Sequence, residues 1–208
     1  AIENIDAGTV EAITATGVTA SAKVYNANTT ATLNTGSAVI TNGAATDDDK
    51  KYYTGDLVVL EKAAATGAFA NKNMGTGKAV IVSGFTLSGT DKDNYTISDA
   101  SSATADITAK PLTITGFASD NKVYNRSTAA VVASAGTLSG IETGDTVNFS
   151  NSGATFDTKN VGTGKTVTLN GVTLTGSGDE TNYSYSSTTT DLSDITAKPL
   201  TITRKTAV

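Results

Sequence analysis

The chain of 208 residues contains no histidine, cysteine or tryptophan and only two prolines. Without His or Cys it can build neither a catalytic triad of the usual kind nor a zinc-thiolate site. The missing cysteines also exclude disulfides, so thiol usage says nothing of the redox compartment. With 15 basic and 20 acidic residues, the net charge is -5, whereas a nucleic-acid-binding domain needs an excess of Lys and Arg. We therefore expect no enzyme activity and no nucleic-acid partner.

Long apolar runs are missing as well. The longest, such as 79–82, fall far short of the roughly 18 residues of a transmembrane helix, so no membrane insertion is expected. The chain begins without Met, and we take it as part of a longer protein. Only 38% of the residues are hydrophobic, but Val, Ile, Leu, Phe and Tyr recur at regular spacing between many Thr. This composition is typical of a folded β-protein with a lean core.

Internal repetition is the main feature of the sequence. The nine residues 107–115, ITAKPLTIT, return unchanged as 195–203. Three further blocks return in the same order: KVYN at 23–26 and 122–125, KNxGTGK at 72–78 and 159–165, and NY at 94–95 and 182–183. The chain is thus two tandem copies of one module.

The first copy carries an insert. The offset between matching blocks drops from 99 to 87 between the second and third blocks, so about twelve extra residues lie within 41–62. This segment is the one place where the first copy differs chemically from the second. It holds an acidic run and a pair of tyrosines: Asp47, Asp48, Asp49, Tyr52 and Tyr53.

Alternating patterns predict the fold class. Residues 166–169 and 172–175 alternate polar and apolar around Asn170-Gly171, which indicates either a hairpin or a Gly-centred bulge that re-aims one strand. Gly-Thr-Gly segments are expected to separate strands, and 47–65 is the only window whose composition would admit a short helix. We predict an all-β protein of two small β-sandwich-like (immunoglobulin-like) modules arranged end to end.

The boundary between the modules is predicted inside the repeated nonapeptide. Ile107 and Ala109 are apolar at odd positions, whereas Leu112 and Ile114 are apolar at even positions, and one flat strand cannot bury both sets on one side. The intervening Pro111 marks a strand end or edge. The modules are therefore expected at 1–110 and 111–208, with this strand shared between the end of one and the start of the next.

These blocks resemble the YDG-type repeats of very large bacterial surface adhesins, which include proteins similar to filamentous haemagglutinin that are exported by two-partner secretion. The family pattern runs Lys-Val-Tyr-Asp-Gly, Phe-x-x-Lys-Asn-Val-Gly-x-Gly-Lys, Asn-Tyr and Ile-x-x-Lys-Pro-Leu-Thr-Ile. Here 122–125, 156–165, 182–183 and 195–202 fit it, while Asn-Ala and Asn-Arg replace the Asp-Gly. The resemblance implies an extracellular, cell-surface location, tandem arrays and an architectural role without enzyme activity.

Two groups of residues suggest ions. Asp47, Asp48 and Asp49 are candidate calcium ligands, since calcium takes six to eight oxygens, although consecutive carboxylates cannot all face one ion from a strand. The Gly-Thr-Gly-Lys segments superficially resemble a phosphate loop, but the glycine spacing and the following strand favour a turn. No other cofactor is expected.

Two further groups suggest covalent or ligand chemistry. A desolvated Lys, an Asn and a protonated acid can form an intramolecular isopeptide bond, and each copy offers one such set: Lys23, Asn94 and Asp106, and Lys122, Asn182 and Asp194. Tyr52 and Tyr53 are candidates for stacking against a carbohydrate. The alternative to the isopeptide bonds is surface Lys and Asn turns, and the alternative to calcium binding by the acidic run is a solvated loop. The aromatics that recur in both copies are predicted core anchors: Tyr25, Tyr124, Phe69, Phe156, Tyr95 and Tyr183.

The most economical interpretation is a monomeric structural spacer from the stalk of an extracellular bacterial adhesin, which projects a distal binding region for cell adhesion or biofilm formation. Its partners are then neighbouring repeats of the same chain. The alternative is a ligand-binding module that contacts a host-surface glycan or protein through the insert at 41–62.

Overall fold

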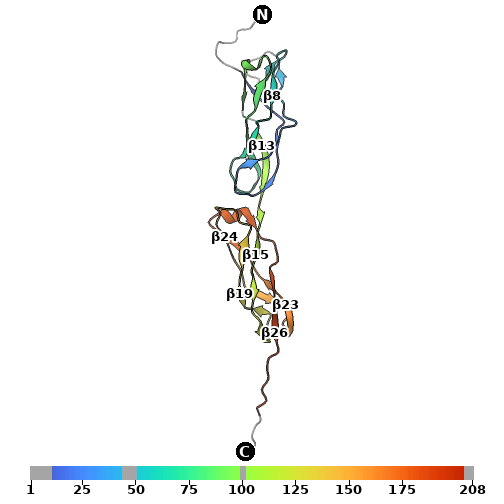
Figure 1. Cartoon of the computed structure of the whole chain (residues 1–208), viewed down its shortest axis with the longest axis vertical. Coiled ribbons are helices and arrows are strands. Elements are labelled where there is room, and N and C mark those ends of the chain that lie inside the picture. Colours follow the sequence, from blue (N-terminus) through green and yellow to red (C-terminus); the bar gives the residue numbers. More distant parts are fainter. Residues whose placement is uncertain (1–10, 44–50, 99–101, 204–208) are drawn as a thin grey trace, which may run out of the picture. The chain divides into compact units, whose positions relative to one another are not determined.

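The computed structural model describes residues 11–43, 51–98 and 102–203. Over these residues it is all-β, as expected, with short strands and two short 3-10 helices and without an α-helix. The chain divides into two compact units, unit 1 (Ala1–Thr108) and unit 2 (Ala109–Val208) (Figure 1). The structure thus places the division after Thr108, whereas the sequence places it after Lys110. Among the described residues, no helix combines the length and apolar character of a membrane span.

The elements of unit 1 are mostly two to four residues long. They are β1 (Glu11–Thr14), β2 (Thr19–Ala20), β3 (Lys23–Val24), β4 (Thr30–Ala31), β5 (Leu33–Asn34), β6 (Asn42–Gly43), β7 (Tyr52–Tyr53), β8 (Val59–Glu61), β9 (Thr66–Phe69), β10 (Gly75–Ser83), β11 (Thr86–Ser88), η1 (Lys92–Asn94), β12 (Tyr95–Ser98) and β13 (Ser102–Thr108).

Unit 2 repeats this series. Its elements are β14 (Lys110–Pro111), β15 (Thr113–Thr115), β16 (Ala118–Ser119), β17 (Lys122–Val123), β18 (Ala129–Ala130), β19 (Val132–Ser134), β20 (Thr137–Ser139), β21 (Val147–Ser150), β22 (Ala154–Phe156), β23 (Gly162–Leu169), β24 (Thr173–Gly176), η2 (Asp179–Asn182), β25 (Tyr183–Ser184) and β26 (Thr190–Thr196).

The two units share one topology. Each has a five-stranded sheet of matching order, β3-β13-β10-β9-β4 in unit 1 and β17-β26-β23-β22-β18 in unit 2. The remaining strands form two-stranded pairs, of which β1 with β12, β14 with β25 and, in unit 1 alone of the described units, β6 with β7 are parallel. In both five-stranded sheets the last strand of the unit runs parallel to an early one, β13 beside β3 and β26 beside β17.

The alternating positions face the core. In β23, Val167 and Leu169 are 0% and 5% exposed, and in β13 Ile107 is 2% exposed. Burial also changes phase within the repeated nonapeptide, where Leu112 is 1% and Ile114 is 9% exposed. The predicted phase change is therefore confirmed. Five of the six recurring aromatics are buried, and Tyr124 is half-buried against the core of unit 2, so their prediction as core anchors is confirmed as well.

The Asn170-Gly171 step is not a hairpin. The strands on its two sides belong to different sheets, since β23 pairs with β22 and β26 whereas β24 pairs with β21. Gly171 has a φ of +57°, and a Cβ there would lie 2.4 Å from Oγ of Ser152. In unit 1, Gly84 has a φ of +84° and a Cβ would lie 2.3 Å from the carbonyl oxygen of Ala64. Glycine is needed at both because the chain turns from one sheet to the next against neighbouring backbone or side chain.

A further expectation is corrected. The Gly-Thr-Gly segments do not separate strands, because they lie inside β10 and β23, where each shifts the register of pairing. The window 47–65, whose composition would admit a short helix, contains β7 and β8 in its described part, 51–65. The apolar run Leu-Val-Val-Leu at 57–60 buries Val58 and Leu60 and exposes Val59 between them, and β8 pairs with β11, so this segment is a strand.

Candidate functional site

A tyrosine hydroxyl ties two segments together at one end of each unit. In unit 1, buried Tyr95 donates to Oδ2 of Asp56 at 2.6 Å and accepts from the backbone N–H of Tyr53 at 2.9 Å. In unit 2, buried Tyr183 donates to Oδ2 of Asp145 at 2.7 Å and accepts from the N–H of Glu142 at 2.9 Å. The same hydroxyl therefore fixes the same loop in both units.

The acidic loops after β11 and β24 hold backbone as well. Oδ2 of Asp91 accepts from the N–H of Leu57 at 2.8 Å, and Oδ2 of Asp179 accepts from the N–H of Thr146 at 3.0 Å. These contacts attach η1 and η2 to the loop that the tyrosine ties down. Among the described residues, no group of three or more acidic side chains is placed to hold a metal ion.

The Gly-Thr-Gly bulges are closed by an aspartate from the neighbouring strand. Oδ1 of Asp106 accepts from the N–H of Gly77 at 2.7 Å, and Oδ1 of Asp194 accepts from the N–H of Gly164 at 2.8 Å. An aspartate carboxylate thus accepts the hydrogen bond from the backbone N–H that, in a phosphate loop, would bind the ligand. The segments are therefore β-bulges closed by a carboxylate, neither the turns that the sequence predicts nor a phosphate site.

A lysine holds the loop that follows β3 and β17. Nζ of Lys23 donates to the carbonyl oxygens of Asn28 and Thr30 at 2.7 and 3.0 Å and lies 5.3 Å from the ring centre of Phe69. Nζ of Lys122 makes the matching bonds to Ser127 and Ala129 at 2.6 and 2.7 Å and lies 5.1 Å from the ring centre of Phe156. Burial lowers the pKa of Lys23, although the ring and carbonyls favour its charged form.

In each unit, the loop held by this lysine contains a non-glycine residue of positive φ. Ala27 has a φ of 59° and Arg126 a φ of 69°. They occupy the position at which the YDG pattern carries its glycine. The physical reason for that glycine is therefore a left-handed backbone, which Ala and Arg adopt here at a cost.

The members of the proposed isopeptide sets have different partners. Lys23 and Lys122 bond to the loop carbonyls described above, and Asp106 and Asp194 bond to glycine amides. Asn94 and Asn182 lie in η1 and η2, beside the tyrosine tie. An isopeptide bond stays a prediction, and the described contacts give each lysine and each aspartate a structural role without one.

The candidate ligand-binding tyrosines are half-buried. The rings of Tyr52 and Tyr53 each meet Tyr95 edge to face, with ring centres 6.4 Å apart, and both pack on a cluster that includes Ile13 and Val58. Much of their surface is therefore engaged within unit 1. The candidate calcium ligands Asp47, Asp48 and Asp49 lie outside the described residues.

Unit 2 has one polar cluster that unit 1 lacks. Oδ2 of Asp191 accepts from the N–H and the hydroxyl of Ser119 at 2.7 and 3.0 Å, and buried Ser193 lies 2.7 Å from the same hydroxyl. These bonds, the Ser119 N–H foremost, lower the pKa of Asp191. The matching positions in unit 1 are Ala20, Ala103 and Ala105, so the cluster is a variation in core packing and not a repeated site.

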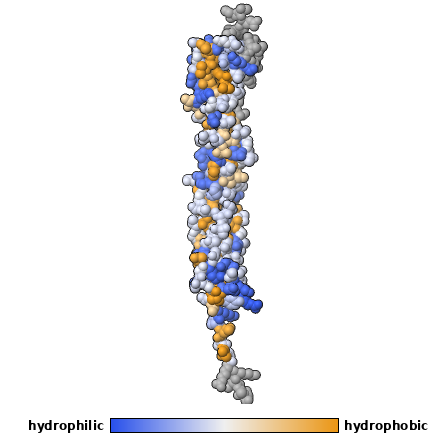
Figure 2. All heavy atoms as spheres, turned by 90° about the vertical axis from the view of Figure 1, so that its right-hand side faces the viewer, coloured by the Kyte–Doolittle hydropathy of each residue, from blue (hydrophilic) through white to orange (hydrophobic). Residues whose placement is uncertain are grey.

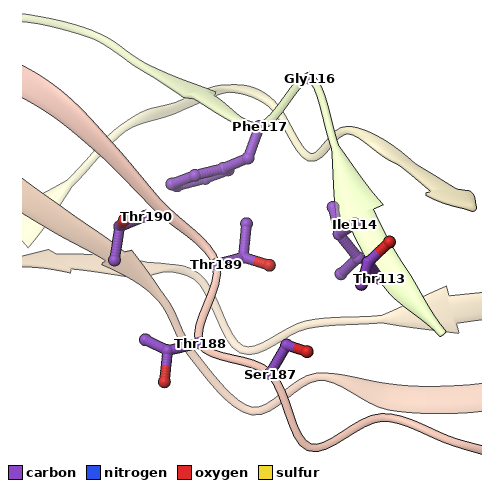
Figure 3. Close-up of a pocket in the computed structure, with 8 residues that line it drawn as sticks. All are labelled: Thr113, Ile114, Gly116, Phe117, Ser187, Thr188, Thr189 and Thr190. Carbon is purple, nitrogen blue, oxygen red and sulfur yellow. The ribbon is translucent and has the colours of Figure 1, made fainter. Parts of the chain in front are cut away.

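A shallow hollow of unit 2 is lined by residues without ionisable groups (Figure 3). Phe117 and Ile114 form its apolar side, and Ser187, Thr188 and Thr189 supply hydroxyls from the segment before β26. Such a lining offers no general acid, base or metal ligand. In unit 1, a hollow beside Tyr95 holds one charged pair, Lys92 with Asp93, and these bond to each other.

The sequence contained a signal for the tyrosine tie that the block comparison passed over. The tripeptide Thr-Gly-Asp occurs at 54–56 and again at 143–145. Its aspartates, Asp56 and Asp145, are the acceptors of the two tyrosine hydroxyls. The tie also locates the insert more narrowly, because Thr16 pairs with Val39 much as Thr115 pairs with Thr137. Because Thr-Gly-Asp repeats at an offset of 89, about ten of the extra residues of the first copy lie between Val39 and the amide of Tyr53, and the other two lie between Asp56 and Lys72.

These features define a class: a tandem repeat protein of all-β modules whose recurring polar residues hold each module together. The chain belongs to the YDG domain family, which matches residues 9–104 and 108–190. Neither a curated protein nor a solved structure gave a significant match.

Proposed function

We propose that the two units are spacer modules in the stalk of an extracellular bacterial adhesin and that they transmit force along the chain. The observation that carries the proposal is the parallel pairing of early and late strands within each unit. In unit 2, β17 pairs with β26 in parallel, with Lys122 opposite Ile195. Lys110, where the unit begins, pairs instead with Tyr183.

This arrangement sends the chain in at one end of a unit and out at the other. The segment from β14 to β17 spans 110–123, at most roughly 45 Å at about 3.3 Å per residue. Because β26 runs in the same direction as β17, it leaves the unit at the far end of that segment. Figure 1 shows β24 and β26 well separated along unit 2. Opposite points of attachment are what a module in a serial array requires.

The connection between the units is short. β13 ends at Thr108 and β14 begins at Lys110, so only Ala109 separates them. Force applied to the chain passes from β13 to β14 without a flexible linker to take it up. Within each unit it loads parallel strands along their length, so that their hydrogen bonds share the load.

The recurring polar residues support a structural role. Side chains at three pairs of matching positions make internal hydrogen bonds in both units: Tyr95 and Tyr183, Asp106 and Asp194, and Lys23 and Lys122. The role needs no catalysis and no cofactor. The family resemblance supports a bacterial cell-surface location, with neighbouring repeats as partners.

A binding experiment separates the spacer from a ligand-binding module. The full chain and a variant whose 41–52 segment is shortened to the loop of unit 2 are applied to a glycan array and to host cells. Both should show the same background signal. Binding by the full chain that disappears in the shortened variant would contradict the spacer role for unit 1 and favour recognition through the 41–52 segment, which includes Tyr52.

A further inference from the structure

The segment that follows the last strand of unit 2 has apolar side chains in solvent. Residues 198–203 read KPLTIT and lie beyond β26. Leu200 is 89% and Ile202 is 95% exposed, the two highest values among the exposed large hydrophobic residues of the described chain. Figure 2 shows apolar atoms standing out on the thin stretch just before the grey C-terminal residues.

The same six residues have a defined place at the start of unit 2. There KPLTIT is 110–115, Leu112 is 1% exposed and Ile114 is 9% exposed. Lys110 and Pro111 pair with β25, the N–H of Leu112 donates to the carbonyl of Ser184 at 2.8 Å, and β15 pairs with β20. Unit 1 buries the matching positions too, since Ile13 is 0% and Ala15 is 1% exposed.

Unit 2 already contains one copy of this strand in the place where a second copy would bind. Its own copy fills the place beside β25 and β20, and its last sheet strand ends at Thr196 next to Val123. From Ala197 to Thr203 the chain is exposed. The sequence KPLTIT is therefore buried at the start of unit 2, where it contacts a module body, and exposed after unit 2, where it contacts none.

We propose that 198–203 is the first strand of another YDG module, and that it binds the body of that module as β14 and β15 bind the body of unit 2. The body here means everything in a module that follows its first strand, which in unit 2 is 116–196. This inference rests on burial and repetition, and it holds whether or not the modules serve as a stalk.

A salt bridge indicates which kind of body the strand selects. In unit 2, Nζ of Lys110 lies 2.6 Å from Oε1 of Glu142, with both side chains 28% exposed. In unit 1, Tyr53 occupies the position of Glu142, because both backbone amides donate to the tyrosine tie, and Glu11 occupies the position of Lys110. Since Lys198 repeats Lys110, its partner should carry a carboxylate at the Glu142 position, as unit 2 does and unit 1 does not.

The test extends the full chain. A second copy of 116–196 is joined directly after residue 203 of the chain. Limited proteolysis with intact-mass detection then measures how fast the appended body is cleaved. The appended body should resist cleavage. The pair Leu200→Asp and Ile202→Asp should accelerate its removal by about tenfold or more, because cleavage follows the population of the open form and two large apolar side chains are lost from the core. Lys198→Glu should accelerate it by about two- to fivefold, and Glu142→Lys in the appended copy should restore resistance.

The unextended chain of 208 residues is the control. There, Leu200→Asp with Ile202→Asp should leave the melting temperature unchanged. A lower melting temperature would mean that the segment belongs to unit 2 and would overturn the proposal. So would an appended body that is cleaved from the outset, or one that resists equally well with and without the two substitutions.

Discussion

Removal of one hydroxyl group, by Tyr183→Phe, tests the tie between strand and loop. The hydroxyl donates to the Asp145 carboxylate at 2.7 Å and accepts from the Glu142 amide at 2.9 Å, while the tyrosine is 6% exposed. A hydrogen bond to a charged group contributes about 1.5–3 kcal/mol, and a neutral one about 0.5–1.5 kcal/mol. Asp145 lies near the surface and water replaces part of what is lost, so we expect unit 2 to lose about 2 kcal/mol.

For a unit of this size, that loss lowers the melting temperature by roughly 10 °C. The assay is thermal and urea unfolding of the full chain, with hydrogen exchange to assign each transition to a unit. Tyr95→Phe should lower the transition of unit 1 and leave unit 2 in place.

Tyr124→Phe is the matched control. This ring packs half-buried against the same core of unit 2, and no hydrogen bond of its hydroxyl is among the described contacts, so its change should stay within about 0.5 kcal/mol. Asp145→Asn should lower the free energy of unfolding of unit 2 by less in the Tyr183→Phe background than in the wild type, because the carboxylate and the hydroxyl form one hydrogen-bonded pair. Equal stability of Tyr183→Phe and wild type would refute the structural role assigned to the tie.

Three further outcomes follow from the structure. Ala27→Gly should stabilise unit 1 by about 0.5 kcal/mol. It relieves a left-handed backbone that costs an L-residue about 1–2 kcal/mol, but the higher entropy of glycine in the unfolded chain offsets part of this gain. The control Ala68→Gly, in strand β9, should instead destabilise unit 1 by about 0.5–1 kcal/mol. Because the pKa of Asp191 is lowered in the folded state, its contribution to the stability of unit 2 is complete above the ordinary pKa of 3.8 and is lost as the pH falls below it. Asp191→Asn should therefore make the free energy of urea unfolding of unit 2 less dependent on pH below about 4. An unchanged pH dependence in this range would count against the contribution. EDTA should leave the melting temperature of the full chain unchanged, and a lower melting temperature would establish a structural cation. The intact mass should equal that calculated from the sequence, and a mass lower by one ammonia per unit would establish the isopeptide bonds.

The sequence was sufficient for the fold class because period-two alternation and exact repetition are local signals. Alternation located the buried positions of β13 and β23, and the phase change in 107–115 separated Ile107 from Leu112. Sheet partners could not be derived in the same way. The Asn170-Gly171 step has the composition of a hairpin, but strand pairing over long sequence separations decides that the chain changes sheets there.

The polar contacts were predicted least well. Recurring Asp residues suggest ions or catalysis in a sequence, whereas their bonds to backbone amides, such as that of Asp106 to Gly77, exist only once strands are paired. The Thr-Gly-Asp repeat was visible, but nothing in the sequence links Asp56 to a tyrosine 39 residues away. The left-handed residues Ala27 and Arg126 were likewise visible only as departures from a family pattern.

The central claim is that each unit carries force along parallel strands that join its two ends, and single-molecule pulling tests it directly. The chain has no cysteine, so introduced thiols define the points of attachment. Pulling on the two ends of the full chain should give two unfolding events, each releasing roughly 30 nm at about 3.4 Å per residue. Pulling unit 2 through Arg126→Cys and Ala197→Cys, which separates β17 from β26 at their common end, should break the pair at a force several-fold lower. Equal forces in the two geometries, or a higher force when the strands are peeled, would contradict the account.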